Sequence, residues 1–313
     1  MSKSVHLQAH IPESLAGQRL DQALAALFPE YSRSRLQTWI RDDSVRVNGN
    51  ILRPRDRVRG GEFVELLSEL KEETPWTPED VPLEVVYSDP YLLVVDKPAG
   101  WVVHPGAGNA NGTLVNALLH HAPELSLLPR AGLIHRLDKD TTGLLVVART
   151  LEVYYALTKQ LQKRAMLREY EALVNGVMLA GGTVDAPLGR HPIDRTKIAV
   201  MASGRPAVTH YWVIQRFSAH THLRLHLETG RTHQIRVHMA HLRYPVVGDP
   251  VYGGRVRVPM GASKALITAL QNFQRQALHA ARLGFIHPVT EKEMEWQSPL
   301  PADFQNLLKL VVS

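Results

Sequence analysis

A change in composition between residues 69 and 82 constrains the fold of this 313-residue chain more than any other feature. The segment is rich in acidic residues and carries three prolines, Pro75, Pro78 and Pro82, which is the composition of a linker. The sequence on either side of it has regularly spaced apolar residues. The chain therefore divides into a short first domain and a longer second one, in line with a length of about 100–200 residues per domain.

The first part of the chain, from residue 17 to about residue 67, has the pattern of two helices followed by a small sheet. The apolar residues of the first helix recur at helical spacing, and Pro29 closes it. Its stripe consists of Leu20, Ala23, Leu24, Leu27 and Phe28. The second helix begins near residues 32–34, with a serine as its cap. Its stripe consists of Leu36, Trp39 and Ile40.

A short alternating segment follows the second helix and reaches Asn48 and Gly49, a favoured signal for a tight hairpin. We expect the returning strand to begin at residues 51–52. Three arginines flank the apolar stripe of the second helix, namely Arg33, Arg35 and Arg41. They form either an ordinary solvated helix face or a basic surface that contacts RNA.

The second part contains many short strands with helices between them, which predicts an α+β fold with a mixed, largely antiparallel sheet flanked by helices. The expected strands lie at residues 83–87, 91–95, 144–148, 169–175, 208–217 and 223–227. The expected helices lie at residues 114–121, 152–165 and 233–241.

Composition excludes several classes of site. The chain has no cysteine, so it has no disulfides, iron–sulfur clusters or cysteine-based zinc sites, which fits a cytoplasmic protein. It has neither the apolar core of a signal peptide at its start nor an apolar run long enough to span a membrane. A net charge of +6 and a pI of about 9.5 favour a polyanionic partner, although many basic proteins bind no nucleic acid.

The densest group of chemical residues is the segment 135–143, HRLDKDTTG, which lies between apolar segments. An aspartate in such a loop, Asp138 for example, can act as a nucleophile or a general base. Alternatively, the aspartates bond nearby backbone amides and the loop is structural. A hydrolase that pairs Asp138 with His104 or His135 is a more remote reading.

A second cluster, residues 229–241, lies where a strand passes into a helix. Arg231 or Arg236 could hold a carboxylate of the first cluster ionised, or both could be surface charges beside a helix cap. The histidines here lack the spacing of a metal-binding helix, so we expect no metal. The glycine-rich residues 96–108 match neither a P-loop nor a dinucleotide fingerprint; they form a tight turn or a loop that approaches a nucleotide.

Taken together, these segments resemble the ribosomal large-subunit pseudouridine synthases that carry an amino-terminal S4 RNA-binding domain, most closely the D type. The resemblance covers nearly the whole chain. It is carried by residues 17–24 and 31–35 of the S4 module and by residues 96–108, 135–143, 168–171, 230–238, 248–253 and 276–280 of the catalytic part. It implies an amino-terminal segment at 1–16, an S4 domain at 17–75, a linker at 76–83 and a pseudouridine synthase domain at 84–313.

The resemblance also implies roles for single residues. Asp138 becomes the catalytic aspartate, Arg236 its partner, and Tyr170 a residue that lies against the uracil and handles a proton. Arg136 would enter the RNA helix and help to flip the target base out, and Leu278 would pack near that base. The arginines of the second helix would bind RNA.

The implied reaction is the isomerisation of uridine to pseudouridine in bacterial 23S rRNA, at the stem-loop of the intersubunit bridge, by a monomer that needs no cofactor. Its partner would be large-subunit rRNA or a pre-ribosomal particle. Two alternatives remain open: a synthase that acts on tRNA or on another rRNA site, and an inactive relative that only binds RNA. Retention of Asp138, Tyr170 and Arg236 argues against the inactive relative.

Overall fold

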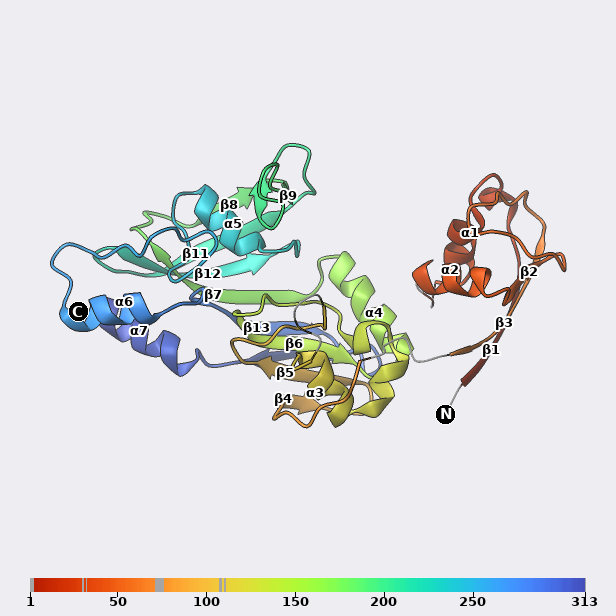
Figure 1. Ribbon diagram of the computed structural model, residues 1–313, viewed down its shortest axis with the longest axis horizontal. Coiled ribbons are helices and arrows are strands. Elements are labelled where there is room, and N and C mark those ends of the chain that lie inside the picture. The colour runs from red at the N-terminus through yellow and green to blue at the C-terminus, as the bar shows by residue number, and fades with distance from the viewer. Residues whose placement is uncertain are drawn as a thin grey trace. The chain divides into compact units, whose positions relative to one another are not determined.

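The computed structural model describes residues 3–29, 31, 33–70, 76–106, 109 and 111–312. The chain forms two compact units (Figure 1). Unit 1 contains residues 1–75 and 124–131, and unit 2 contains residues 76–123 and 132–313. Within the described residues, no helix is both long enough and apolar enough to cross a membrane.

Unit 1 is a three-stranded antiparallel sheet, in the order β1–β3–β2, with two helices. Its elements are β1 (Lys3–His10), α1 (Leu20–Leu27), α2 (Arg33–Arg41), β2 (Val45–Val47) and β3 (Phe63–Leu70), with a 3-10 turn at Glu13–Leu15. Both predicted helices are confirmed. The serine cap expected near residues 32–34 lies outside the described residues and side chains.

The sheet of unit 1 differs from the prediction in two ways. Residues 1–16 are not merely a terminal segment, because β1 pairs with β3 over its whole length. The turn at Asn48 and Gly49 is present, with both residues at positive φ, but a returning strand at residues 51–52 was wrong. Residues 53–56 turn instead, and β2 pairs with the later strand β3.

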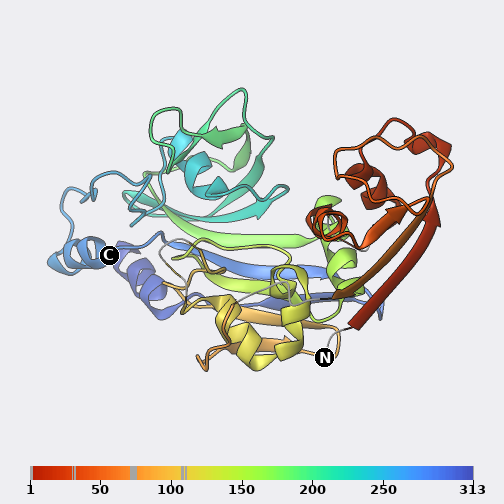
Figure 2. The same ribbon diagram turned by 45° about the vertical axis from the view of Figure 1, so that its right-hand side comes forward.

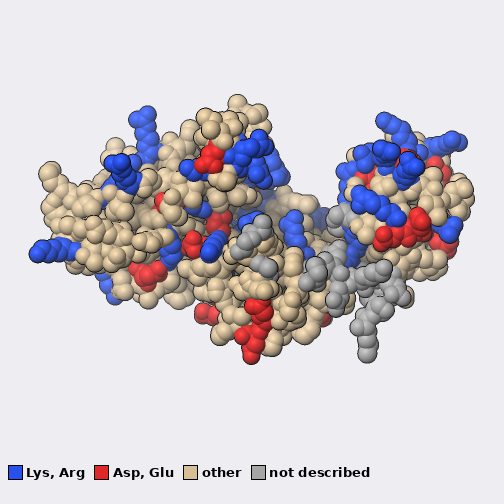
Figure 3. Space-filling view, in the orientation of Figure 1, with Lys and Arg blue, Asp and Glu red and all other residues tan. Residues whose placement is uncertain are grey.

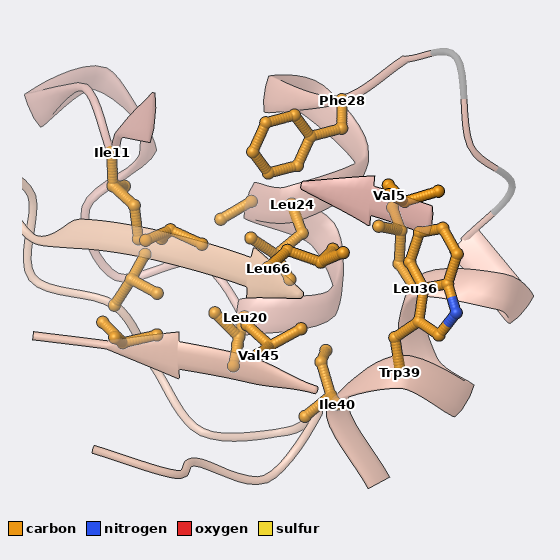
Figure 4. Packing of buried hydrophobic residues seen from close by; sticks show 14 residues of the cluster. Val5, Ile11, Leu20, Leu24, Phe28, Leu36, Trp39, Ile40, Val45 and Leu66 are labelled. Carbon is orange, nitrogen blue, oxygen red and sulfur yellow. The ribbon is translucent and has the colours of Figure 1, made fainter. Parts of the chain in front are cut away.

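The core of unit 1 is built by the predicted apolar stripes (Figure 4). The side chains that meet there include Leu20, Leu24, Phe28, Leu36, Trp39, Ile40, Val45 and Leu66. Burying each such side chain contributes about 1.5–3 kcal/mol relative to leaving it in water. The two helices are therefore held by their apolar faces against the sheet, and their polar faces remain at the surface.

A fully buried carboxylate, Asp21, ties the two helices of unit 1 together. It accepts hydrogen bonds from Arg19 Nε at 3.0 Å, from Arg33 Nη2 at 2.7 Å and from Gln37 Nε2 at 2.5 Å. Burial by itself would raise the pKa of Asp21, but the bonds from Gln37, Arg33 and Arg19 outweigh burial and leave the pKa below its usual value. Arg33 thus has a structural role.

Unit 2 is organised around a nine-stranded sheet in the order β4–β5–β6–β13–β7–β12–β11–β8, with β14 added on β13. The strands are β4 (Glu84–Ser88), β5 (Leu92–Lys97), β6 (Thr142–Ala148), β7 (Leu167–Asn175), β8 (Gly182–Asp185), β11 (Val208–Arg216), β12 (His220–Leu227), β13 (Leu278–Ile286) and β14 (Glu293–Gln297). Among the strand pairs of this sheet that the structure describes, β6–β13 alone is parallel. The mixed, largely antiparallel α+β fold is confirmed.

The remaining elements of unit 2 flank this sheet (Figures 1 and 2). They are α3 (Leu114–His121), α4 (Leu151–Gln162), β9 (Leu188–Arg190), β10 (Ile198–Val200), α5 (Gln234–His241), α6 (Lys264–Asn272) and α7 (Ala302–Val312). Strands β9 and β10 form a separate two-stranded ribbon, and α5 packs against β10 and β11. The helices α3, α4 and α5 were predicted; α6, α7 and the strands β8, β9, β10, β13 and β14 were not.

The parallel pair β6–β13 fixes the loop of residues 135–141. Gly143 faces Ala280 across this pair at a φ of 111°. A Cβ at Gly143 would lie 2.3 Å from the carbonyl oxygen of Ala280, so no other residue fits without a shift of the strand. The loop that precedes β6 is therefore anchored at its carboxyl end by the close β6–β13 pair inside the sheet.

We expect Asp21→Asn to lower the free energy of unfolding of unit 1 by about 1–3 kcal/mol, since hydrogen bonds from charged donors to a buried carboxylate are lost. A carboxylate whose pKa falls on folding contributes its stability above the unfolded pKa of about 3.9, and that contribution is lost as the pH falls through the folded pKa. The difference between wild type and variant should therefore shrink in acid.

The measurement is hydrogen–deuterium exchange of the α1 and α2 amides, corrected for intrinsic exchange, from about pH 7 down to about pH 3. Asp42→Asn, at an exposed position, is the matched control. Its α1 and α2 amides should be protected from exchange as strongly as those of wild type. Equal protection of wild type and Asp21→Asn at neutral pH contradicts this role of Asp21.

Candidate active site

Asp138 lies in the loop that leads into the central strand β6. The loop closes in a turn, in which the Thr141 amide donates to the Asp138 carbonyl at 3.1 Å. The buried Thr141 hydroxyl also accepts a hydrogen bond from Gln276 Nε2 at 3.0 Å, which ties the loop to the segment before β13. The backbone is thus fixed, while the Asp138 side chain remains 17% exposed and within reach of a substrate.

A buried lysine anchors the same loop from the other side. Lys97 is fully buried at the end of β5, and its Nζ donates to the carbonyl oxygens of Pro98 at 2.8 Å, Trp101 at 3.1 Å and Lys139 at 2.8 Å. Burial lowers the pKa of Lys97 to about 7, and the nearby carboxylates oppose that shift. One amino group therefore joins the loop after β5 to the loop of Asp138.

Arg236 on α5 joins Asp138 to a second carboxylate. Its Nη1 lies 2.9 Å from Asp138 Oδ2, while Nε and Nη2 bind Asp249 at 2.7 and 2.9 Å in a two-pronged pair. Arg236 is 4% and Asp249 3% exposed. This geometry makes Arg236 a fixed cation with one edge held by Asp249 and the other directed at Asp138.

The second carboxylate is held by more than the arginine. Asp249 Oδ1 also accepts the backbone amides of Val251 at 2.9 Å and Tyr252 at 3.0 Å. Burial by itself would raise the pKa of Asp249, but the bonds and charge of Arg236 and these two amides leave it below its usual value. Burial likewise disfavours the charged form of Arg236, but the two carboxylates raise its pKa above the usual value. Asp249 and Arg236 are therefore both ionised.

Tyr170 lies on β7, with 6% of its surface exposed. Burial raises its pKa above the usual value, Asp138 adds to that rise, and Arg168 opposes it. The hydroxyl therefore carries its proton at neutral pH. Leu278 is buried on the adjacent strand β13, where it pairs with Ala172, two residues beyond Tyr170. The two residues that were expected near the base lie on neighbouring strands.

The histidines near the site form no metal centre in the part of the chain that the structure describes. His238 is buried and bonds Thr209 and the Ala186 carbonyl, whereas His241 is exposed. His135 accepts a hydrogen bond from the Val146 amide at 3.4 Å, and burial, with Arg168, lowers its pKa to about 3. A neutral His135 bonded to the backbone is a poor partner for a hydrolytic Asp138.

Comparisons with known proteins agree with this site. The family described as RNA pseudouridylate synthase matches residues 91–241, and the S4 domain family matches residues 18–64. The chain is 56% identical to the ribosomal large subunit pseudouridine synthase D of Pseudomonas aeruginosa, over 99% of this chain and 97% of that protein. The chain belongs to the RNA pseudouridine synthase family.

Other relatives of this synthase fit the same assignment. The ribosomal large subunit pseudouridine synthase D of Escherichia coli strain K12 is 54% identical, over 99% of this chain and 96% of that protein. The solved human RNA pseudouridylate synthase domain containing 4 superposes with a TM-score of 0.57 at 27% identity, over 73% of this chain and 92% of that chain. The protein is therefore an isomerase.

The arginines that were expected to bind RNA differ in their exposure and in the contacts that they make. Arg136 is exposed beside Asp138, as base flipping would require, and Arg41 is exposed on α2. Arg33 is engaged with Asp21. Arg35 is only 7% exposed, with its guanidinium 5.9 Å from the centre of the Trp39 ring, so it offers little surface to RNA.

Sequence reasoning gave no role to several residues that the structure places in or near the site of the synthase. Asp249 and Tyr252 fell inside a quoted motif, and Lys97 inside another, but nothing in their spacing shows that Lys97 and Asp249 are buried or that Arg236 lies on the Tyr252 ring. In unit 1, a basic segment without apolar periodicity was also passed over. It contains Arg53, Arg55, Arg57 and Arg59, all exposed.

We expect Asp249→Asn to lower kcat about 10- to 100-fold, because an amide cannot hold both Nε and Nη2 of Arg236 as a carboxylate does. KM for RNA should stay within about twofold, since Asp249 is buried away from the surface that RNA would contact. Steady-state kinetics on an RNA substrate measure both values. Glu152→Gln, an exposed carboxylate on α4, is the control. A loss confined to KM contradicts an orienting role for Asp249.

Proposed function

We propose that this synthase converts specific uridines of bacterial large-subunit rRNA into pseudouridine, with Asp138 as its catalytic carboxylate. The Arg236–Asp138 pair at 2.9 Å is the observation that carries the proposal. The substrate is supported by the relatives named ribosomal large subunit pseudouridine synthase D, which match 99% of the chain. Within that rRNA we propose the stem-loop of the intersubunit bridge, modified in the cytoplasm by a monomer.

The chemistry requires an ionised, fixed carboxylate. The glycosidic carbon–nitrogen bond must break, the uracil must turn over, and a carbon–carbon bond must form to the same ribose. These steps balance without any oxidant or energy source. Arg236 donates to Oδ2 of Asp138 and holds it, so the carboxylate faces the reacting nucleotide in one orientation.

Tyr170 is proposed to contact the uracil. Its ring can stack on the base, and its hydroxyl is protonated at neutral pH because burial raises its pKa. That hydroxyl can donate a hydrogen bond to the base. It can take the proton from carbon 5 only while its own proton moves on. Leu278 on the adjacent strand supplies the apolar packing next to this position.

The target uridine has to leave its stack before Asp138 can reach it, at a cost of a few kcal/mol. Arg136 is two residues from Asp138 and is exposed, so its long side chain is available to fill the space that the base vacates. Filling that space would offset part of the unstacking cost. Because the site takes a single extruded nucleotide, loops of rRNA are easier substrates than continuous helices.

Unit 1 is proposed to capture the rRNA through its basic surface. Figure 3 shows Lys and Arg side chains gathered on the visible face of unit 1. The exposed cations of this unit include Arg41 and the four arginines of residues 53–59. Neutralising phosphates releases counterions, so this contact should depend strongly on salt.

We expect Asp138→Asn to abolish the release of tritium from 5-tritiated uridine in large-subunit rRNA while RNA binding stays within about twofold of wild type, because only the carboxylate charge is removed. The rRNA is taken from a strain that lacks this enzyme, so that the target uridines are unmodified. Glu152→Gln is the control and should release tritium as wild type does.

Near-normal release by Asp138→Asn would refute the catalytic role of the carboxylate. Release from tRNA but not from rRNA by the wild type would refute the substrate. Sequencing of the modified positions then tests the intersubunit-bridge stem-loop.

We expect the double variant Arg55→Gln and Arg59→Gln to raise KM for rRNA while leaving kcat unchanged, since these exposed side chains of unit 1 are proposed to contact phosphates and belong to the unit that lacks Asp138. The slope of log affinity against log salt should fall by roughly 1.5 for two lost phosphate contacts. The control carries the same change of charge in unit 2, Lys159→Gln with Lys292→Gln, both exposed. An equal effect in the two double variants would mean that total charge, not this surface, matters.

A further inference from the structure

His233 begins α5 in an unusual way. Its backbone is in the left-handed region, with φ 56° and ψ 21°, and its side chain makes no capping bond to the helix. A residue at this position normally uses its side chain to bind a free amide of the first turn. A strained conformation persists only where the surrounding structure requires it. Here the ring is used between Tyr252 and Asp138.

The Tyr252 hydroxyl makes two hydrogen bonds within the described residues. The Ile198 amide lies 3.0 Å from its oxygen and can only donate. His233 Nδ1 lies 2.8 Å from the same oxygen. Burial raises the pKa of Tyr252, so its proton is retained at neutral pH. The Tyr252 proton can bond Nδ1, whereas in the reverse direction, with Nδ1–H donating, that proton would have no partner among the described residues.

This arrangement selects one tautomer of the histidine. Burial, with Arg236, lowers the pKa of His233 below its usual value although Asp138 opposes the shift, so the ring is neutral at neutral pH. A neutral imidazole has one donor and one acceptor nitrogen. Because Nδ1 accepts from Tyr252, the proton lies on Nε2. That nitrogen is 3.9 Å from Asp138 Oδ1, the oxygen that Arg236 does not bind.

We propose that His233 is a positioning residue for Asp138, which holds Oδ1 through its Nε2–H while Arg236 holds Oδ2, and that Tyr252 selects the tautomer. A distance of 3.9 Å exceeds a hydrogen bond, so the contact has to shorten when uridine binds, as catalytic hydrogen bonds often do. A carboxylate oxygen has two lone pairs, so one donor still leaves Oδ1 able to react. The inference rests on the catalytic role of Asp138 proposed above.

The variant His233→Asn isolates the donor. Asparagine tolerates the left-handed backbone, and its amide stands where Nδ1 does, so the bond to Tyr252 can persist. It is too short to reach Asp138. We expect kcat to fall about tenfold, because one hydrogen bond to a charged group is lost in the transition state. KM for rRNA should stay within about twofold. His241→Asn, exposed on the same helix, is the matched control.

Nitrogen-15 NMR of the full-length, histidine-labelled protein reads the tautomer without relying on turnover. The His233 signals are those missing in His233→Asn. Wild type should show a protonated Nε2 and a bare Nδ1, and Tyr252→Phe should show a mixture of tautomers together with a smaller loss of kcat.

A protonated Nδ1 in wild type overturns the inference, as does an unchanged kcat in His233→Asn or a loss confined to KM. Turnover by Asp138→Asn is a separate result, because it refutes the proposed catalytic aspartate. Turnover that requires Asp138 but ignores His233 refutes the positioning role alone.

Discussion

The triad Asp138–Arg236–Asp249, of which Arg236 and Asp249 are buried, is the interaction on which the rest of the catalytic unit depends. Bringing a guanidinium into a site where it is 4% exposed is costly unless its donors are satisfied. Asp249 offsets that cost because it accepts hydrogen bonds from Nε and Nη2 of Arg236. Asp249 is itself fixed by hydrogen bonds from two backbone amides. The third guanidinium nitrogen, Nη1, therefore points at Asp138 before any substrate binds. Asp138 is thus oriented by a group that has no freedom to follow it.

The strands of unit 2 place the two halves of this triad. Asp138 and Arg236 are 98 residues apart in sequence, and each lies next to a strand of the same sheet. Gly143 lets β6 approach β13, and Lys97 ties the loop before β6 to the loop after β5. The loop of Asp138 is therefore held in place by contacts with both neighbouring segments. A loop that is so fixed can present a charged side chain without the entropy loss that a flexible loop would suffer on binding substrate.

Local patterns predicted local structure well and distant contacts poorly. The apolar stripe through Leu20 and Leu24 predicted α1 because helical spacing can be recognised from residues that are close in sequence. Strand β1 was missed although Val5, Leu7 and Ala9 alternate, because its partner β3 comes some 60 residues later. The pairing of Asp138 with Arg236 came from family resemblance, and the burial of Lys97 and Asp249 could not be read at all. Which ions meet in a folded protein depends on tertiary packing, which spacing along the chain does not encode.

The net charge of the protein is not shared evenly between its two units. At the active site, the guanidinium of Arg236 lies between the carboxylates of Asp138 and Asp249. Unit 1, residues 1–75 and 124–131, holds 12 Lys and Arg and 12 Asp and Glu, so the +6 of the whole chain lies in unit 2 and any basic surface of unit 1 is a local one. Exposed arginines such as Arg55 and Arg59 can attract RNA at long range, where screening by salt is the main limit. Buried ions act only over a few ångströms and orient one nucleotide, so capture and chemistry can vary independently.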